Sequence, residues 1–458
     1  MAQSRTRSLT DGRILPLLLE FCFPVFLGNL LQQFYSLTDT AIVGQVLGMN
    51  ALAAVGSVGS LNFLVIGFCA GFCAGFAIPI AQSFGAKDEK EVRRYTANIV
   101  WLCLGFAVAL TALTALLCST FLRWMRTPDD IFADANSYIL IIFLGIPATL
   151  LYNMLAGIIR ALGDSRAPVY FLGIAAALNI GLDFLLTLVI PWGVAGTAIA
   201  TVLAQAISGA LCFVFLLKKY PILRIRREEW RISPYHCRVL CGVGVPMGLQ
   251  FSITAIGCII LQAAVNDLGP TAIAAVSAAN RISNFLACPL DALGTTCATF
   301  TGQNIGAQRT DRVRCGAKLS FLLGLIYSAI AVLICVILGN PLGELFVGAN
   351  EPGAVALIYR FDLINCAFYP LLTLIYVFRN TVQGMGYSRV AIFAGLFEMV
   401  ARSVFGAWVI PAFGFTAACF GGPAAWVFAD LFLVPVYFVC IRRTEQQLAA
   451  EHRLKNTR

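Results

Sequence analysis

The chain has 458 residues, of which 59% are hydrophobic and only 12% are charged, about half the charge of an ordinary soluble domain. This composition excludes a single soluble domain, a disordered chain and a nucleic-acid-binding protein, and it predicts a polytopic membrane protein. The formal net charge of +9 does not predict a nucleic-acid partner, because loops that face the cytoplasm collect Lys and Arg.

Long apolar stretches follow one another along the whole chain. About 20 apolar residues cross a bilayer as a helix, and Gly, Pro, Asn or charged residues cluster at the breaks between such stretches. Continuous runs of this length favour helices over a β-barrel, whose short strands alternate in polarity. The twelve predicted spans cover residues 14–46, 52–84, 92–121, 131–158, 168–190, 194–217, 239–265, 272–305, 313–338, 353–378, 390–410 and 415–441.

The basic residues predict the orientation of these spans. If the N-terminus is cytoplasmic, most of the 32 Lys and Arg residues fall in the inner loops and tails, and few fall in the outer loops. This asymmetry is the usual determinant of topology. We therefore expect both termini to lie in the cytoplasm, in the inner membrane of a prokaryote.

The second half of the chain repeats the first. Residues 77–86 (AIPIAQSFGA) match residues 298–307 (ATFTGQNIGA), and residues 51–55 (ALAAV) match residues 272–276 (AIAAV). Further matches in the same order pair Pro24 with Pro246, Pro147 with Pro370 and Gly163 with Gly386. Because each repeat holds six spans, the two halves have the same orientation, and a pseudo-two-fold axis along the membrane normal should relate them.

The repeat predicts the domain organisation. We expect an N-lobe with spans 1–6 at residues 1–217, a cytoplasmic linker at 218–238, a C-lobe with spans 7–12 at 239–441, and a cytoplasmic tail at 442–458. The predicted fold class is an all-α polytopic membrane protein with twelve transmembrane helices in two six-helix bundles.

Polar residues of three spans lie at a similar predicted depth. Asp39, Asp183 and Thr201 each lie seven residues from the outer end of their span, which places them about 10 Å below the outer surface at 1.5 Å per residue. Asn179 lies one turn deeper than Asp183 on the same helix face. We therefore expect these four residues to form one site in the N-lobe.

Two acids in one dry pocket point to cation coupling. A charged group in mid-bilayer costs about 2.5–3.5 kcal/mol by insertion scales, so buried acids usually have a role. Burial and mutual repulsion both favour uptake of a proton. The same oxygens could instead coordinate Na⁺, since hard cations prefer oxygen ligands. We favour H⁺ over Na⁺; a purely structural role, in which the acids only hydrogen-bond neighbouring helices, stays open.

Several segments together resemble one known family. The motifs are residues 34–39 (FYSLTD), 81–86 (AQSFGA), 160–164 (RALGD), 193–201 (GVAGTAIAT) and 302–307 (GQNIGA), with Asn179 and Asp183 in span 5. The chain resembles the multidrug and toxic compound extrusion (MATE) family along all twelve spans. It is most similar to the branch of the DNA-damage-inducible and archaeal members.

This resemblance implies a function and a site. It implies export of organic, often lipophilic cationic compounds by alternating access, driven by inward H⁺ or Na⁺, and it assigns the cation site to Asp39, Asn179, Asp183 and Thr201. The Vibrio-type branch carries a functional acid in span 7, whereas residues 239–265 contain none and Gln250 is their most polar buried candidate. A flippase for a lipid-linked saccharide or another amphiphile is the alternative.

Substrate-binding residues are expected around these acids and in the C-lobe. Phe34, Tyr35, Tyr152 and Phe184 lie near the acid-bearing turns or in span 4, and aromatic faces attract organic cations, although core packing is the commoner role of such residues. In the C-lobe, Glu398 and Arg402 have the spacing of an intrahelical ion pair, which favours a structural role over cleft lining. Asp291 is the C-lobe acid that best fits a functional role, with Asp430 a weaker candidate.

The remaining expectations concern partners and chemistry. We expect small organic substrates and membrane lipid as partners, no nucleic acid, and a monomer. No catalytic site, metal site or cofactor is expected apart from the coupling ion, because the sequence has two His residues and no HExxH, GxSxG or P-loop motif. The chain is therefore not expected to be an enzyme.

Overall fold

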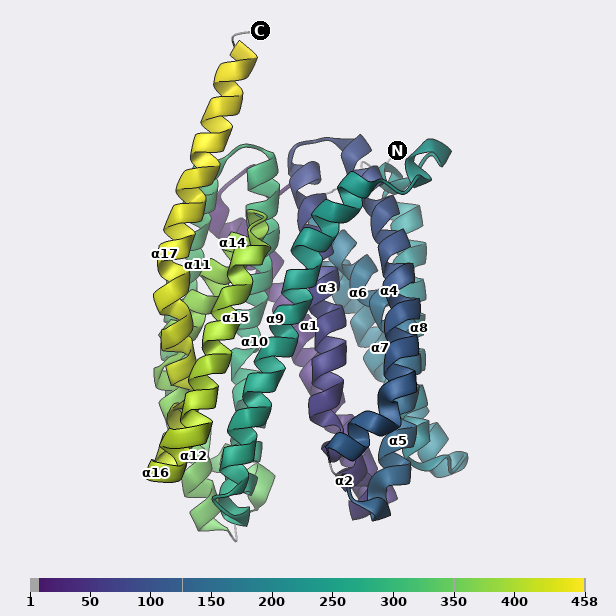
Figure 1. Ribbon diagram of the computed structural model, residues 1–458, viewed down its shortest axis with the longest axis vertical. Coiled ribbons are helices and arrows are strands. Elements are labelled where there is room, and N and C mark those ends of the chain that lie inside the picture. Colours follow the sequence, from purple (N-terminus) through teal and green to yellow (C-terminus); the bar gives the residue numbers. More distant parts are fainter. Residues whose placement is uncertain (1–7, 126, 349–350, 457–458) are drawn as a thin grey trace. The chain divides into compact units, whose positions relative to one another are not determined.

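The computed structural model describes residues 8–125, 127–348 and 351–456, with side chains as far as Ala450. Residues 1–7 of the predicted N-lobe and 457–458 of the predicted tail lie outside the described residues. The described part of the chain folds into helices joined by turns, without a strand (Figure 1). This result is expected for apolar segments in lipid, where a helix satisfies its own backbone hydrogen bonds.

The helices before residue 234 follow the first six predicted spans. The second predicted span is divided into α2 and α3, and the fourth consists of α5 and α6, which meet at a bend of 45° beside Gly145. The elements are α1 (Ile14–Ile42), η1 (Val43–Leu47), α2 (Met49–Ser57), α3 (Gly59–Gly85), α4 (Glu89–Trp124), α5 (Asp129–Leu144), α6 (Ile146–Ala161), α7 (Arg166–Phe184), η2 (Leu185–Val189), α8 (Gly193–Lys219), η3 (Pro221–Leu223) and η4 (Arg227–Trp230).

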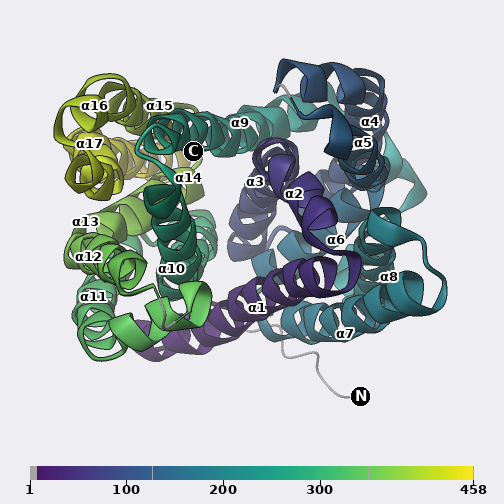
Figure 2. The ribbon, with the colours of Figure 1, turned by 90° about the horizontal axis from the view of Figure 1, so that it is seen from below.

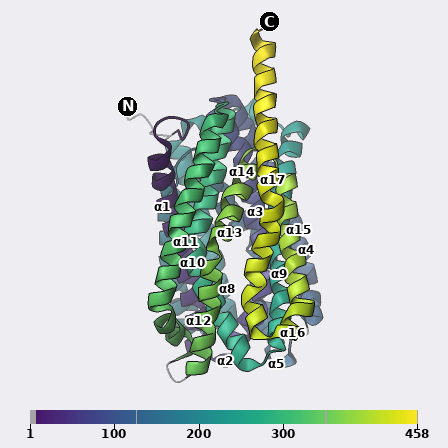
Figure 3. The same cartoon turned by 90° about the vertical axis from the view of Figure 1, so that its left-hand side faces the viewer.

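The later helices repeat this pattern. The tenth predicted span is bent by 49° at Phe368, between α12 and the helices that follow it. The elements are α9 (Pro234–Asn266), α10 (Pro270–Gly306), α11 (Thr310–Val347), α12 (Pro352–Ala367), α13 (Tyr369–Leu374), η5 (Ile375–Arg379), α14 (Asn380–Gly384), α15 (Ser388–Val404), η6 (Phe405–Val409), α16 (Ile410–Phe413) and α17 (Phe415–Asn456). Figure 3 shows the last turns of α17 projecting beyond its neighbour α11.

Eleven of the predicted spans are long and apolar enough to cross a membrane, if each bent pair among the described residues is taken as one span. The exception is α10, the eighth predicted span, which is a continuous helix of 37 residues. It carries Arg281 and Asp291 within its apolar sequence. These two charges explain why its composition alone is less typical of a span.

The helices form two compact units that share two long helices. The first unit comprises essentially Leu27–Ser252, and the second comprises Leu9–Phe26 with Ile253–Arg458. The first half of α1 therefore packs in the second unit, and the first half of α9 packs in the first. Figure 2 shows α7 beside α8 in the first unit and α15 beside α17 in the second.

The start of the chain is held in the second unit by hydrogen bonds. The backbone N–H of Leu9 donates to Oε1 of Gln303 at 2.8 Å. The Arg312 guanidinium donates to the carbonyl oxygens of Gly12 at 2.8 Å and of Leu9 at 3.3 Å. These bonds fix the entry into α1 against α10 and α11.

Candidate functional site

The two acids of the first unit face one another. Asp39 lies on α1 and Asp183 lies on α7, and both side chains are buried, with 9% and 0% of their surface exposed. Their carboxyl groups are close enough for one to donate a hydrogen bond to the other when it is protonated. The structure therefore brings together the two acids that the sequence predicts at one depth.

Neither acid has a basic partner among the residues that the structure describes. Oδ1 of Asp39 and both carboxylate oxygens of Asp183 are buried without a hydrogen-bond donor from this part of the chain. Two such carboxylates side by side are costly in a medium of low dielectric constant unless a proton or a cation neutralises them. The pair is thus arranged to take up positive charge.

The other two predicted residues complete the site. Asn179 lies one turn before Asp183 on α7, and its Nδ2 donates to Oγ1 of Thr201 on α8 at 3.4 Å. Oδ1 of Asn179 is buried without a donor among the described residues. The four predicted residues therefore come from α1, α7 and α8 of one unit.

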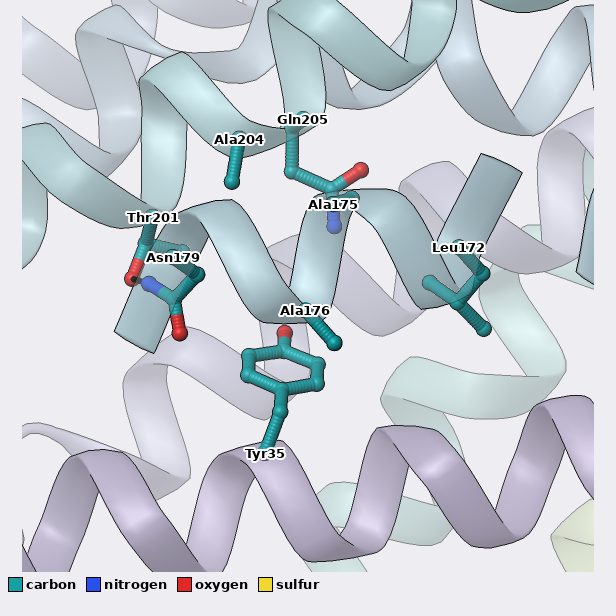
Figure 4. Close-up of a pocket in the computed structure, with 8 residues that line it drawn as sticks. All are labelled: Tyr35, Leu172, Ala175, Ala176, Asn179, Thr201, Ala204 and Gln205. Carbon is teal, nitrogen blue, oxygen red and sulfur yellow. Dashed lines mark hydrogen bonds between the residues drawn. The ribbon is translucent and has the colours of Figure 1, made fainter. Parts of the chain in front are cut away.

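A small cavity lies beside the Asn179–Thr201 hydrogen bond. It is about 10 Å³, close to the room that one water molecule needs. Tyr35 reaches it from α1, and Gln205 reaches it from α8 one turn after Thr201 (Figure 4). The remaining lining residues are mostly small, which leaves this room: Leu172, Ala175, Ala176 and Ala204.

Two neighbours of the site were missed by the sequence interpretation. Gln205 follows Thr201 by four residues, so its helical spacing was an available signal. Tyr138 on α5 is buried and interacts electrostatically with Asp39 and Asp183. Its position depends on packing between helices distant in sequence, so no local signal indicated it.

Local helix geometry distinguishes the two acid-bearing helices. Asp183 lies two residues before the π-helical turn η2, and Asp39 lies four residues before the π-helical turn η1. A π turn widens the helix by one residue per turn and is often found at functional sites. Both acids therefore lie where the regular hydrogen-bond ladder of their helix changes.

Some of the aromatic residues predicted to bind substrate are buried near the acid pair, and others are exposed. Tyr35 lines the cavity, and Tyr152 is buried on α6. Phe34 and Phe184 are 52% and 46% exposed, so their side chains lie outside the buried site. Gln250 is buried on the part of α9 that belongs to the first unit.

The second unit has a cluster of four charged side chains. Glu398 on α15 pairs with Arg402 at 3.5 Å, as its spacing predicts, and also with Arg379 of η5 at 3.1 Å. Asp430 on α17 is buried near Glu398 and Arg379, and neither of its oxygens has a donor among the described residues. We name these four residues the charged cluster.

Arg379 corrects one predicted boundary. The sequence interpretation ended span 10 at residue 378 and assigned Arg379 to an inner loop. The structure continues the helix through η5 and α14 to Gly384, and the Arg379 side chain is only 14% exposed. Arg379 packs within the unit because it pairs with Glu398, and a count of apolar residues does not detect such a pair.

Two further acids of the second unit lie apart from the charged cluster. Asp291 on α10 is half-buried and lies near Tyr376 of η5 and Cys22 of α1. Asp362 on α12 is 2% exposed and accepts a hydrogen bond from Oγ of Ser283 at 2.9 Å. Asp362 was missed, although an acid within predicted span 353–378 was a visible signal.

An open apolar pocket of about 430 Å³ lies along η6, α16 and α17, and Phe368 lines it from the bend between α12 and α13. Four phenylalanines contribute to it, and Thr416 is the one polar side chain among its lining residues. The lining residues are Phe368, Phe405, Val409, Phe413, Thr416, Ala417, Phe420, Pro423, Ala424 and Val427. The second unit thus combines a neutralised charged cluster with an open apolar pocket.

Comparison with known proteins places this architecture among membrane transporters. The MatE family model matches residues 24–185 and 246–408, which correspond to the two halves of the sequence repeat. "Probable multidrug resistance protein YpnP" of Bacillus subtilis is 28% identical over 379 residues, covering 82% of this chain and 84% of the relative. The "FAD transporter" of Shewanella oneidensis is 23% identical and covers 79% of each chain.

A solved structure has the same fold. An outward-facing multidrug resistance MATE family transporter of the MOP superfamily superposes with a TM-score of 0.89 at 19% sequence identity, covering 95% of this chain and 98% of that one. At this identity the likeness concerns the fold alone: helices in two bundles that span the membrane. The similar proteins are transporters, which points away from an enzyme.

Proposed function

This chain belongs to the multidrug and toxic compound extrusion family, and from this premise we propose that it is an antiporter that exports organic, lipophilic cations in exchange for H⁺. The observation that carries the proposal is the contact between Asp39 and Asp183 without a basic partner among the described residues. Multidrug transport is the activity of the family; the coupling ion and the class of substrate are our proposals.

The charge of the Asp39–Asp183 pair couples the export of substrate to the uptake of a proton. When at least one carboxyl group is ionised, the first unit attracts a cationic substrate. A proton that enters the pair removes this charge and replaces the repulsion between the acids with a hydrogen bond. The protonated pair therefore favours a different packing of α1 against α7, and the substrate loses its counter-charge in the same step.

H⁺ is favoured over Na⁺ by the direct approach of the two carboxyl groups. Two acids that can share a hydrogen bond need only one proton to become stable. Na⁺ would need several oxygen ligands around it. The oxygens of Asn179 and Thr201 could contribute to such a shell, so Na⁺ coupling is the outcome that the test must exclude.

The test is efflux from proteoliposomes under one ion gradient at a time. A fluorescent organic cation is loaded, and either a pH gradient or a Na⁺ gradient is imposed on wild type, Asp39→Asn and Asp183→Asn. We expect drive by the pH gradient in wild type and no drive in either variant. Asp134→Asn, which changes an exposed acid of α5 in the same unit, is the matched control and should transport normally. Drive by Na⁺ alone would overturn proton coupling, and full activity of both variants would remove the site.

Export of an anionic amphiphile is the second candidate. One relative is named an FAD transporter, and the phosphates of FAD carry negative charge, which supports this candidate. Flipping of a lipid-linked saccharide belongs to the same class. In the same vesicles, an anionic dye that competes with the organic cation would support this candidate, whereas transport of the cation alone would exclude it.

We also propose that a single chain is the transporting unit, with no cofactor beyond the coupling ion and with both termini in the cytoplasm. Small organic molecules and lipid are its proposed partners. The mass of the protein in nanodiscs tests the monomer. The orientation is tested in sealed cells by labelling one cysteine introduced near each terminus of a variant whose sixteen native cysteines are replaced by serine. Labelling from outside at either end would contradict the proposed topology.

A further inference from the structure

The segment between α8 and α9 is folded onto the first unit. Glu229 of η4 is buried, and both of its carboxylate oxygens accept from Nε of Arg93 on α4 at 2.9 Å. The backbone N–H of Ser233 donates to Oδ1 of Asn98 on the same helix at 2.8 Å. These bonds hold the segment against α4, at the upper end of the unit in Figure 1. We name residues 220–238 the linker segment.

Trp230 places the linker segment at the end of a lipid-facing stripe. The indole N–H of Trp101 on α4 donates to the Trp230 carbonyl oxygen at 2.9 Å, and the two rings meet edge to face at 6.4 Å. From Trp101, exposed apolar side chains continue along one face of α4 at Leu104 and Val108. Trp101 also lies within predicted span 92–121, so the linker segment lies beside the span rather than beyond it.

The outer surface of the linker segment is apolar at several positions. Trp230, Ile232 and Tyr235 are 40%, 63% and 66% exposed. Tryptophan and tyrosine are enriched where a membrane protein crosses from lipid tails to headgroups. Residues of this kind in a connection between spans indicate contact with the membrane surface.

Four arginines lie in the same segment as these apolar side chains. Arg224, Arg227, Arg231 and Arg238 are exposed, and none forms an ion pair within the part of the chain that the structure describes. Glu229 is already engaged by Arg93, so it does not neutralise the guanidinium groups through a salt bridge. The surface therefore combines free positive charge with apolar side chains.

We propose that the linker segment binds the headgroups of anionic phospholipids, with Arg224, Arg227, Arg231 and Arg238 contacting phosphate and with Trp230, Ile232 and Tyr235 entering the interface. Clusters of basic residues next to a span attract anionic lipid, each by about 1 kcal/mol. A free phosphate ion would use the arginines and leave the apolar residues unexplained. A nucleic acid would also leave Trp101, Leu104 and Val108 without a partner.

The first test counts bound lipid on the intact protein. Native mass spectrometry of the detergent-solubilised chain is performed with phosphatidylglycerol and with phosphatidylcholine of the same acyl chains. We expect wild type to bind phosphatidylglycerol in preference to phosphatidylcholine. In Arg227→Gln/Arg231→Gln, the affinity for phosphatidylglycerol should fall by about fivefold for each arginine removed. The matched control is Arg442→Gln/Arg443→Gln, which removes the same charge from two exposed arginines of α17. Equal losses in both variants would overturn a local site.

Two competition arms separate the possible ligands. Inorganic phosphate and a short single-stranded oligonucleotide are added to the phosphatidylglycerol complex. We expect neither to displace the lipid at concentrations where phosphatidylglycerol saturates the site. Displacement by phosphate would indicate a simple anion site, and displacement by the oligonucleotide would indicate a nucleic-acid surface; either result overturns the proposal.

A second measurement does not depend on the arginine variants. Phospholipids brominated near the headgroup quench tryptophans at the interface. We expect the intensity that Trp230 contributes, obtained as the difference between wild type and Trp230→Phe, to be quenched in phosphatidylglycerol bilayers. An unquenched Trp230 would place the segment in water and would contradict the proposal even if an arginine variant failed to fold.

Discussion

In the first unit the buried acids Asp39 and Asp183 have no basic partner among the described residues, whereas in the second unit Glu398 lies between Arg379 and Arg402. Both arrangements place charge inside a helical bundle. The acid pair of the first unit has no basic partner among the described residues, whereas Glu398 in the second unit is paired with two arginines. The comparison indicates that the sequence repeat preserves the scaffold, while the buried charge in each unit is arranged for a different task.

The π-helical turns η2 and η6 occupy matching positions in the two units, so the residues that precede them can be compared directly. The π-helical turns η2 and η6 are each followed by an Ile-Pro pair, at residues 190–191 and 410–411. Asp183 lies two residues before η2, and Ser403 occupies that position before η6. Arg402, one residue earlier, points about 100° away around the helix. The second unit therefore has a basic residue on a neighbouring face and no acid at the matching position.

The largest expected effect concerns Asp183 of the first unit, whose substitution should stop transport without lowering stability. Asp183→Asn should abolish pH-driven transport, because the remaining acid no longer has a carboxyl partner with which to share a proton. The variant should unfold at the same temperature as wild type or higher, since it removes a buried carboxyl group without a donor. Transport and thermal unfolding in detergent are measured on the same preparation. A variant that is strongly destabilised but still transports would show that Asp183 has a structural role and no role in transport.

The charged cluster should respond in the opposite way. Glu398→Gln leaves Arg379 and Arg402 buried without their acid, so we expect a loss of about 3–5 kcal/mol of unfolding free energy. Asp430→Asn is the control from the same cluster and should not destabilise the protein, because Asp430 has no donor among the described residues. Denaturant titration of both variants measures the difference. Equal stabilities would show that the arginines do not depend on Glu398.

A smaller effect, which depends on pH, is expected for the stability contribution of Asp164 in the connection between the fourth and fifth spans. Asp164 accepts from Nζ of Lys219 at 2.8 Å and from the Tyr220 hydroxyl at 2.9 Å. Burial would raise the pKa of Asp164, but these bonds and the backbone N–H of Ala167 hold the pKa below its ordinary value of 3.8. At the matching place after Gly386, the second unit has Tyr387, which bonds to neutral side chains of α17.

The sign of this effect follows from the lowered pKa. The ionised Asp164 stabilises the fold fully above pH 3.8, and this contribution is lost as the pH falls through its lower pKa in the folded protein. We expect Asp164→Asn to lose about 1.5–3 kcal/mol near neutral pH and to show a flatter decline in acid. Tyr387→Phe should change stability without altering its pH dependence. Unfolding curves from pH 7 to pH 3 distinguish the two variants.

The smallest expected effect lies at the edge of the acid pair. Thr201→Val removes the acceptor of the Asn179 hydrogen bond but keeps the shape of the side chain. We expect transport to slow by about two- to tenfold, the equivalent of one ordinary hydrogen bond of 0.5–1.5 kcal/mol. Thr197→Val, one turn earlier on α8, is the comparison variant, because its hydroxyl bonds to its own helix at Val194. Equal slowing in both would remove Thr201 from the site.

Much of the fold and of the first-unit site was predictable from sequence. Span length, the repeat and the depth of Asp39 and Asp183 are local properties of a helix. The charged cluster was only partly predictable. The Glu398–Arg402 spacing was visible, but the approach of Arg379 and Asp430 depends on packing between α15, η5 and α17. The exposure of Phe34 and Phe184 could not be predicted, because proximity along a helix does not determine the face on which a side chain lies.

The shared helices have a consequence for how the protein is made. Leu9 and Gly12 are bonded to Gln303 and Arg312, about 300 residues later in the chain. At 5–20 residues per second, the ribosome needs roughly tens of seconds to synthesise these partners. The segment that leads into α1 therefore gains these hydrogen-bond partners only after most of the chain has been synthesised.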